Sequence, residues 1–426
     1  MFKDFRGVSR IGVLAVVTAG TGWLFDSYVI NAFTYNLAAI QKTFSLSLAA
    51  IGIITSIYLI GYTLGTVAGG TIADYFGRKR ALIFSITWYV IAAVLSGLAI
   101  SPWMFASFRL LTGVGAGGEL PVSSTFITDT WPAKVRNRGT GLMNLGYPLG
   151  YLLMIAVSLA VVPFWGWRAV FVLAVIPAVL IVIIRLKVSE SPAFVRVNEE
   201  LKKNVGRPRK FTFAQVLHSR YRRQFVGQLL IWIGNGFTFW SFVTFIPLYL
   251  ITVAKVPKSE LAVFLIVFNL FYAVMPYLAT WVSDLIGRRW AGSIAALLSM
   301  IGVWLFTLGP TTRPWLFVVG GLTYGLYAAP WTIGFTFSTE AFPAEIRGSA
   351  ISLVMTIGRV VSIIAPLVVG GLAATIGFGA MMRLSGLMWI VAIVGFLVSK
   401  ETLNVPLTDI VETGEVVGTG ADPVVG

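Results

Sequence analysis

Two short charged stretches, 210 residues apart, constrain the fold of this chain more than any other feature. Residues 69–80 read Gly-Gly-Thr-Ile-Ala-Asp-Tyr-Phe-Gly-Arg-Lys-Arg, and residues 280–289 read Thr-Trp-Val-Ser-Asp-Leu-Ile-Gly-Arg-Arg. Each stretch lies between two long apolar runs, and its glycine permits a sharp turn between them. We refer to the two stretches as the corner motifs. They share an aspartate, a glycine and an arginine: Asp74, Gly77 and Arg78 in the first, and Asp284, Gly287 and Arg288 in the second.

Two further landmarks repeat at nearly the same offset. Residues 128–136 return as residues 339–347, and the acid Glu190 returns as Glu401, both at an offset of 211. Three landmarks in register predict a tandem duplication of about half the chain. Parallel repeats of this kind are a known transporter architecture, with the binding site between the repeats.

The composition indicates a membrane protein. Of the 426 residues, 57% are hydrophobic and only 12% are charged, whereas a soluble domain carries about 25% charged residues. There is no cysteine and a single histidine, His218, which we expect in a solvated loop. Disulfides and thiolate chemistry are therefore excluded. We predict no enzymatic activity, no metal site and no cofactor.

Twelve apolar runs each reach the roughly 20 residues that a membrane-spanning helix needs. We expect a first six-helix half over residues 1–190, a cytoplasmic connector over 191–222, a second six-helix half over 223–400 and a disordered cytoplasmic tail over 401–426. The predicted spans are 11–34, 48–72, 81–100, 103–127, 138–162, 167–187, 223–253, 260–283, 290–309, 315–338, 347–373 and 379–399.

The basic residues predict the orientation in the membrane. Of the 32 Lys and Arg residues, 24 fall in the two terminal segments and in the loops on the same side, and five fall in the opposite loops. Eleven of the 24 belong to the stretch from Arg185 to Arg223 around the connector. Because positive charge accumulates in cytoplasmic loops, both termini are expected in the cytoplasm of a cell-membrane protein. The same asymmetry argues that the net charge of +15 reflects topology and lipid contact, not nucleic-acid binding.

These features resemble the major facilitator superfamily of secondary transporters, over the whole chain except the tail. The run Arg109-Leu-Leu-Thr-Gly-Val-Gly-Ala-Gly-Gly118 in span 4 is similar to the superfamily's Arg-x-x-x-Gly-x-Gly-x-Gly signature. Its glycines at 113 and 117 share one helix face, and small residues at that spacing permit close helix approach. The resemblance implies an all-α integral membrane fold, with twelve transmembrane helices in two pseudo-symmetric six-helix halves that alternate access to a central site.

Details resemble one branch of the superfamily, which holds metabolite:proton and aromatic-acid:proton symporters and organic-anion carriers. Residues 340–348 and the run Glu190-Ser191-Pro192 are similar to that cluster, and residues 358–366 are similar to the span-11 run of the aromatic-acid and organic-anion branches. In span 1, Phe25-Asp26-Ser27-Tyr28-Val29 resembles the Asp-Gly-Tyr-Asp run of the aromatic-acid symporters, with Val29 in place of the second aspartate. Phe335 stands where sugar porters carry tryptophan.

Charges inside membrane spans are rare and functional by default. Asp26 in span 1 and Arg109 in span 4 lie at similar depth and can pair; in related sugar symporters these positions couple transport to protons. Glu119, about 15 Å deeper by the helix rise, is a further coupling candidate. The alternatives are a static Asp26–Arg109 ion pair and a Glu119 carboxylate that balances the basic corner. Arg359, near the middle of span 11, is predicted to bind an anionic ligand or to neutralise one of these acids.

The remaining candidates are polar and aromatic residues of the spans and charged residues of the corners. The substrate-site candidates besides Arg359 are Tyr28, Asn31, Asn144, Gln228, Asn235, Tyr324, Tyr327 and Trp331, of which the last three recur at helical spacing and are also explained by packing. The gating candidates are Asp74, Gly77, Arg78, Arg80, Asp129, Arg136, Asp284, Gly287, Arg288, Glu340 and Arg347.

The sequence therefore predicts a monomeric secondary transporter in the lipid bilayer. Its predicted function is proton symport of a small organic anion, namely a monocarboxylate, an aromatic acid or a sugar acid. The alternative is a proton-coupled sugar or polyol symporter. A third hypothesis is a non-transporting membrane sensor of the same fold, which would not require buried titratable groups at matched depth.

Overall fold

The structure is a computed structural model that describes residues 8–131, 136–191, 195, 221–342 and 344–403. The described part is helical throughout, without strands. Within it, the side chains of Asp74, Asp129, Arg136 and Arg347 lie outside the description. The predicted connector and tail fall almost entirely outside the described residues, so the domain boundaries stay predictions.

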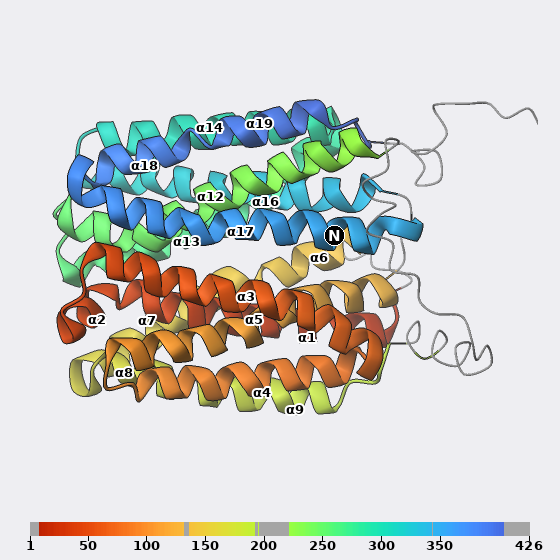
Figure 1. The fold of residues 1–426 in the computed structure, drawn as a ribbon, viewed down its shortest axis with the longest axis horizontal. Coiled ribbons are helices and arrows are strands. Elements are labelled where there is room, and N and C mark those ends of the chain that lie inside the picture. The colour runs from red at the N-terminus through yellow and green to blue at the C-terminus, as the bar shows by residue number, and fades with distance from the viewer. Residues whose placement is uncertain (1–7, 132–135, 192–194, 196–220, 343, 404–426) are drawn as a thin grey trace, which may run out of the picture.

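Long helices run side by side along the length of the molecule (Figure 1). The first half holds α1 (Arg10–Tyr35), α2 (Leu37–Phe44), α3 (Leu48–Phe76), α4 (Arg78–Gly97), α5 (Pro102–Thr130), α6 (Arg136–Asn144), α7 (Gly146–Trp165), α8 (Trp167–Val172) and α9 (Val175–Leu186). The second half holds α12 (Arg222–Thr252), α13 (Lys258–Ile286), α14 (Arg288–Leu308), α15 (Arg313–Trp315), the π-helical segment η2 (Leu316–Gly320), α16 (Gly321–Glu340), α17 (Ala344–Ile376), α18 (Phe378–Gly386) and α19 (Trp389–Val398).

Eleven segments of the described chain are long and apolar enough to cross a membrane. The twelfth span is α5, which is 29 residues long and lies alongside α3 and α4. Its most apolar part is interrupted by Arg109, Glu119 and a run of glycines, and the side chains of Arg109 and Glu119 are buried against neighbouring helices. The predicted twelve-helix fold is confirmed, and the chain is a multi-pass membrane protein. The sequence did not predict the short helix α2 or the breaks that divide four of the spans.

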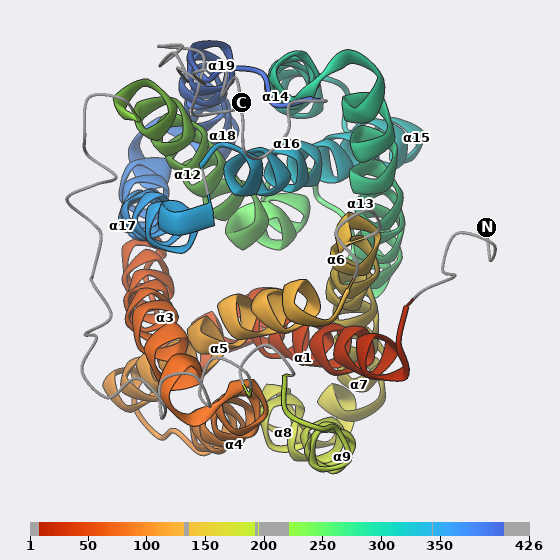
Figure 2. The same cartoon turned by 90° about the vertical axis from the view of Figure 1, so that its right-hand side faces the viewer.

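The two halves lie side by side as two bundles (Figure 2). They meet chiefly along two lines, where α3 packs against α17 and α7 packs against α13, with smaller contacts between α12 and both α1 and α2. On the α3–α17 line the backbones are close: a Cβ on Gly52 would lie 2.5 Å from the carbonyl oxygen of Pro366. One turn further on, Ser56 Oγ donates a hydrogen bond of 2.6 Å to the carbonyl oxygen of Ile363.

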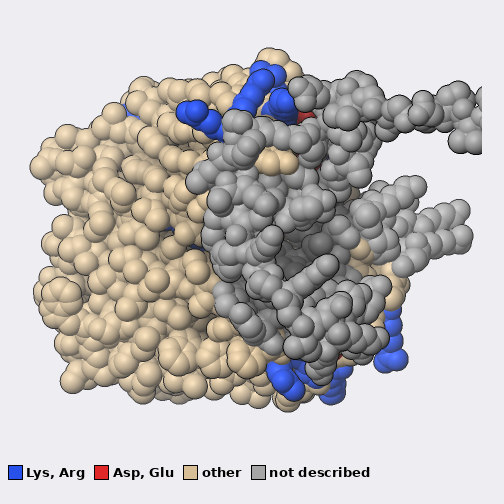
Figure 3. All heavy atoms as spheres, turned by 45° about the vertical axis from the view of Figure 1, so that its right-hand side comes forward, with Lys and Arg blue, Asp and Glu red and all other residues tan. Residues whose placement is uncertain are grey.

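We refer to the end of the bundle where α1 begins and α19 ends as the terminal end. Both corner motifs lie at this end, and most of the Lys and Arg side chains visible in Figure 3 surround it. Gly77 and Gly287 break the chain between consecutive spans with φ of 98° and 92°. Side chains disfavour this conformation, so glycine is required at both corners.

Within the first half, α3 and α5 pack so closely that their backbones are in contact. A Cβ on Gly113 would lie 2.2 Å from the carbonyl oxygen of Tyr58, and one on Gly117 would lie 1.9 Å from that of Tyr62. The glycine face predicted in span 4 therefore makes the close approach expected of it. It also fixes the positions of Tyr58 and Tyr62, two tyrosines one turn apart on α3.

Candidate functional site

Asp26 is the buried acid at the centre of the candidate site. It lies in α1 with 0% of its surface exposed, and neither oxygen of its carboxyl group has a hydrogen-bond partner among the described residues. The charged side chains that interact with it electrostatically are Glu119, Arg359 and Arg109. An ionised carboxylate without hydrogen bonds in such surroundings is costly.

Arg109 does not pair directly with Asp26. Its Nη1 donates a 3.3 Å hydrogen bond to the carbonyl oxygen of Val29, and its guanidinium carbon lies 4.3 Å from the ring centre of Tyr58 and 5.2 Å from that of Phe33. The described residues show no ion pair between Arg109 and Asp26. Similar depth places the two groups near each other, but the guanidinium turns towards aromatic rings, so the expected contact is not formed in this structure.

Arg359 reaches from one half of the molecule to the other. It lies in α17, is 8% exposed, and its guanidinium carbon is 4.3 Å from the ring centre of Tyr62 in α3. Its Nε has no hydrogen-bond partner among the described residues. The guanidinium thus lies on the Tyr62 ring and within reach of the Tyr62 hydroxyl, and its Nε is open to another acceptor.

Glu119 is paired with a cation that the sequence did not single out. Its carboxylate forms an ion pair with Arg185 of α9, and both side chains are 1% exposed. Arg185 also donates to the carbonyl oxygen of Leu82 in α4. A Cβ on Gly22 of α1 would lie 2.1 Å from the Glu119 Oε1 atom, so glycine makes room for the pair. Counting Arg185 among the cytoplasmic loop cations was wrong. It lies in α9, within the predicted span 167–187, and it neutralises Glu119 where four helices meet.

Several polar candidates already have partners within the protein. The Tyr28 hydroxyl donates a 2.8 Å hydrogen bond to the carbonyl oxygen of Val170. Asn31 donates to the carbonyl oxygen of Ser27, one turn earlier in α1. Asn144 is half-buried at the end of α6.

The polar candidates of the second half are also partnered. Gln228 forms hydrogen bonds with Ser399 and Ser338 near the terminal end. Asn235 Nδ2 donates to the carbonyl oxygen of Pro330, while its Oδ1 has no described partner.

Aromatic side chains line the interface between the halves. The rings of Tyr147 and Tyr272 are 5.4 Å apart across it, and Tyr324 lies 5.7 Å from Tyr272. The hydroxyls of Tyr147 and Tyr327 are buried beside the side chains of Asn31 and Trp389, and that of Tyr324 is buried without a hydrogen-bond partner among the described residues. Trp331 packs against other rings of its own half, 5.0 Å from Trp232 and 5.5 Å from Phe239.

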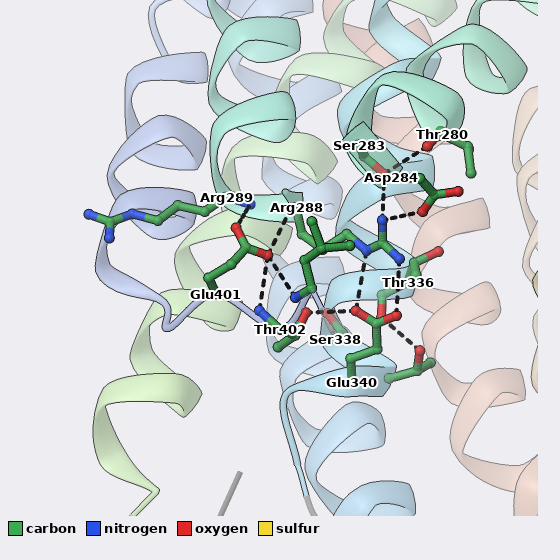
Figure 4. Close-up of polar contacts among 12 residues, drawn as sticks. Thr280, Ser283, Asp284, Arg288, Arg289, Thr336, Ser338, Glu340, Glu401 and Thr402 are labelled. Atoms are coloured by element: carbon green, nitrogen blue, oxygen red, sulfur yellow. Dashed lines mark hydrogen bonds and ion pairs between the residues drawn. The ribbon is translucent and has the colours of Figure 1, made fainter. Parts of the chain in front are cut away.

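The second corner motif forms a dense polar cluster (Figure 4). Arg288 pairs with Asp284 one turn before it and with Glu340 of α16, where Nε to Oε2 is 3.3 Å. Its Nη1 also donates to Ser283 Oγ at 3.1 Å. Thr402 Oγ1 donates a 2.6 Å hydrogen bond to Glu340 Oε2. The structure therefore brings Asp284, Gly287, Arg288 and Glu340 together, and their role in gating stays a prediction.

The first corner motif is described in part. Arg78 Nη1 donates to the carbonyl oxygen of Ala73 at 3.0 Å, and Lys79 Nζ donates to that of Leu186 at 2.8 Å. Arg80 is exposed. The four gating candidates whose side chains lie outside the description stay predictions of the sequence.

Each corner is closed by a carboxylate that was not placed in the site from sequence. Glu190 Oε1 accepts from the backbone nitrogen of Arg78 at 2.8 Å, and Glu401 Oε1 accepts from that of Arg288 at 2.9 Å. Burial acts to raise the pKa of Glu401, but four backbone N–H donors outweigh it and hold the pKa below its usual value. The feature of the sequence that could have identified these two acids is their offset of 211, which matches the repeat of the halves. No group of metal-binding side chains occurs among the described residues.

Comparison with known proteins gives the family. The model of the Major Facilitator Superfamily matches residues 19–267 and 254–415. The niacin transporter NiaP of Acinetobacter baylyi is 28% identical over 379 residues, covering 82% of this chain and 84% of that protein. The gentisate transporter of Corynebacterium glutamicum is 28% identical over 388 residues, covering 87% of this chain and 84% of that protein.

A solved structure agrees on the fold. A crystal structure of a D-xylose-proton symporter superimposes with a TM-score of 0.73 over 92% of this chain and 98% of that one, at 20% identity. At that identity the likeness concerns the fold alone. Together with the family match and the two bundles of helices, it leads to one conclusion: this chain belongs to the Major Facilitator Superfamily and is a transporter, not an enzyme.

Proposed function

We propose that this protein is a proton-coupled symporter of a small aromatic or other organic carboxylate. The observation that carries the proposal is the arrangement of three buried charges near the interface of the halves. Asp26 has no hydrogen-bond partner among the described residues, and Arg109 and Arg359 each lie against a tyrosine ring. Relatives named as niacin, gentisate and cis,cis-muconate transporters support an organic acid as the substrate class.

Asp26 is the proposed proton carrier. Its carboxyl group has no described hydrogen bond that would hold it in one protonation state. The ionised form of Asp26 is stabilised only when Arg109 or Arg359 turns towards the carboxylate, or when water reaches it. A rearrangement of the halves that changes these distances would therefore change its proton affinity, as coupling requires. Glu119 is a poorer candidate because Arg185 already neutralises it.

Arg359 is the proposed carboxylate ligand. An arginine is permanently charged, and its planar fork suits a carboxylate held by two hydrogen bonds. The guanidinium contacts an aromatic face, and its Nε has no described partner, so it retains donors for a ligand. The tyrosines at positions 147, 272 and 324 offer a ring-lined wall for an aromatic body.

The proposed transport cycle uses the two bundles as rocking units. The terminal end, with its corner motifs, is assigned to the cytoplasm because basic residues gather there. The α3–α17 contacts at the opposite end then close the outer side. The corner clusters hold each half's helices together at the inner side, and the protein acts as a monomer in the cell membrane.

The decisive experiment is uptake into proteoliposomes under an imposed pH gradient. We would measure accumulation of nicotinate, gentisate, cis,cis-muconate and gallate, with nicotinamide and D-xylose as uncharged comparisons. We expect uphill accumulation of at least one acid, and its collapse on addition of a protonophore. Accumulation that is indifferent to the pH gradient would refute proton coupling, whereas accumulation of xylose and of no acid would establish the sugar alternative.

A further inference from the structure

Tyr62 and Tyr272 are equivalent residues of the duplicated chain. Each precedes the aspartate of its corner motif by twelve residues, Tyr62 in α3 and Tyr272 in α13. Each also reaches the opposite half: Tyr62 lies under the Arg359 guanidinium, and Tyr272 packs against the ring of Tyr147 at 5.4 Å. The two interfaces between the halves are thus built on one repeated tyrosine.

The partners of these tyrosines differ in charge. At the offset of 211, Arg359 corresponds to Pro148, so the cation occurs on one interface only. Tyr62 is 3% exposed and Arg359 is 8% exposed, which keeps water away from their contact. A cation stacked on an aromatic face is stabilised more strongly when both groups are desolvated.

The position of Tyr62 is itself fixed by packing. Its backbone touches α5 at Gly117, where a Cβ would lie 1.9 Å from the Tyr62 carbonyl oxygen. The backbone of Tyr62 therefore cannot shift towards Arg359, and the arginine must come to the ring. Stacking occupies the face of the guanidinium, and on its edge the Nε–H donor has no described partner.

We propose that Tyr62 is a positioning residue for the carboxylate ligand, which holds Arg359 by its face across the interface and presents its donor edge to the substrate. The inference rests on the proposed carboxylate-binding role of Arg359. It adds that the anion site is complete only while α3 and α17 are in contact, since the cation comes from one half and its platform from the other.

The first test needs no substrate. Melting temperatures would be compared for the parent protein, Tyr62→Leu, Arg359→Gln and the double variant. We expect Tyr62→Leu to lower the melting temperature much less in the Arg359→Gln background than in the parent, and Tyr62→Phe, which keeps the ring, to resemble the parent. Additive losses would show that the two side chains do not interact and would overturn the inference.

The second test separates positioning from general packing. Binding of the acids in the panel and of nicotinamide would be measured for Tyr62→Leu, Tyr62→Phe and the matched control Tyr272→Leu. We expect Tyr62→Leu to weaken binding of the acids by about 2- to 30-fold, the range of a cation–π contact. Tyr62→Phe should restore affinity for the acids, and amide binding should not change in Tyr62→Leu. Tyr272→Leu, which removes part of the ring-lined wall, should weaken binding of nicotinate and nicotinamide alike and leave the ratio of the two affinities unchanged.

The outcomes are distinguishable from failure of the proposed function. Unchanged acid binding in Tyr62→Leu, or an equal fall in the acid-to-amide affinity ratio in Tyr272→Leu, would overturn the positioning role while leaving acid transport intact. If the parent protein bound none of the acids, the proposed function would fail and the carboxylate part of the inference with it, whereas the melting experiment would still decide whether Tyr62 holds Arg359.

Discussion

Glu190 and Glu401 make the same contact at equivalent points of the two halves. Each carboxylate accepts hydrogen bonds from the first two backbone nitrogens of the helix after a corner motif: Arg78 and Lys79 for Glu190, and Arg288 and Arg289 for Glu401. These nitrogens lack partners within their helices, and the helix dipole favours a negative charge beside them. The repeated contact ties the end of each half to its corner.

The Glu401 contact predicts a pH-dependent stability. Because the folded protein lowers the pKa of Glu401, its contribution is present above the ordinary glutamate pKa of about 4.3 and is lost as the pH falls through the lowered folded value. Glu401→Gln should cost about 0.5–2 kcal/mol at neutral pH, as loss of a helix cap does. Melting temperatures of parent and variant between pH 7 and pH 3 should converge towards acid; a constant difference would contradict this assignment.

The buried Glu119–Arg185 pair should be sensitive to removal of one partner. Glu119→Gln leaves the Arg185 charge buried without its counter-ion, and breaking a buried pair in this way costs about 3–5 kcal/mol. We expect a large drop in the melting temperature of the purified protein. The double change Glu119→Leu with Arg185→Met should recover most of it. A stable Glu119→Gln variant with lost proton coupling would instead return Glu119 to the transport mechanism.

Asp26→Asn should separate coupling from substrate movement. Asparagine cannot carry a proton, so accumulation driven by a pH gradient should vanish, while counterflow exchange of a bound acid is partly retained. The melting temperature should not fall, since Asp26 has no described hydrogen bond to lose. Uphill uptake by Asp26→Asn equal to that of the parent would remove Asp26 from the mechanism.

Arg359→Lys should impair anion transport although it keeps the charge. A lysine offers a point charge in place of a two-donor fork. Loss of one hydrogen bond to a charged group costs about 1.5–3 kcal/mol, so the apparent KM for acids should rise by about tenfold or more. Uptake kinetics in proteoliposomes would measure it. The opposing view, that Arg359 only neutralises an acid, predicts that Arg359→Gln combined with Asp26→Asn regains the affinity for acids.

Gly52→Val should open the α3–α17 interface. A Cβ at this position meets the Pro366 carbonyl oxygen at 2.5 Å, so a side chain forces the helices apart at the end opposite the termini. Because the chain has no cysteine, a single introduced cysteine, such as Ser56→Cys, reports the opening through its reaction with an impermeant maleimide. Gly371→Val is the matched control, since a Cβ at Gly371 meets nothing within 4 Å. Equal labelling of both variants would refute the closure.

Sequence reasoning predicted the features that repeat along the chain. The common offset of the corner motifs implied two similar halves, and apolar run length gave the spans, because both follow from local pattern. Counting residues from the helix ends places Asp26 and Arg109 at the same depth, but it does not give the rotation of each helix about its axis. The stacking of Arg109 on Tyr58 was therefore not predicted. Arg185 was counted as a loop charge for a similar reason. A cation near the end of an apolar run resembles a loop charge until its partner Glu119 and the space beside Gly22 are seen.

The tyrosines show the same limit. Tyr28 was selected by position in span 1, yet its hydroxyl is bonded to the Val170 carbonyl in the interior of its own half. Tyr58 and Tyr62 were not predicted as site residues. The sequence of an apolar span does not show whether a charged side chain lies over the ring of one of its aromatic residues. Only the packing of α3 on α5 shows that both rings support arginines.

The two corner carboxylates also bear on how the molecule could be taken apart. Glu190 is fastened to the first bundle just before the chain leaves it, and Glu401 is fastened to the second in the same way. Among the described residues, each corner is therefore closed by a carboxylate of its own bundle. The stretch between the bundles supplies neither of these two carboxylates. Two separately synthesised fragments, divided within that stretch, would each carry a complete fastening and could reassemble as a split transporter.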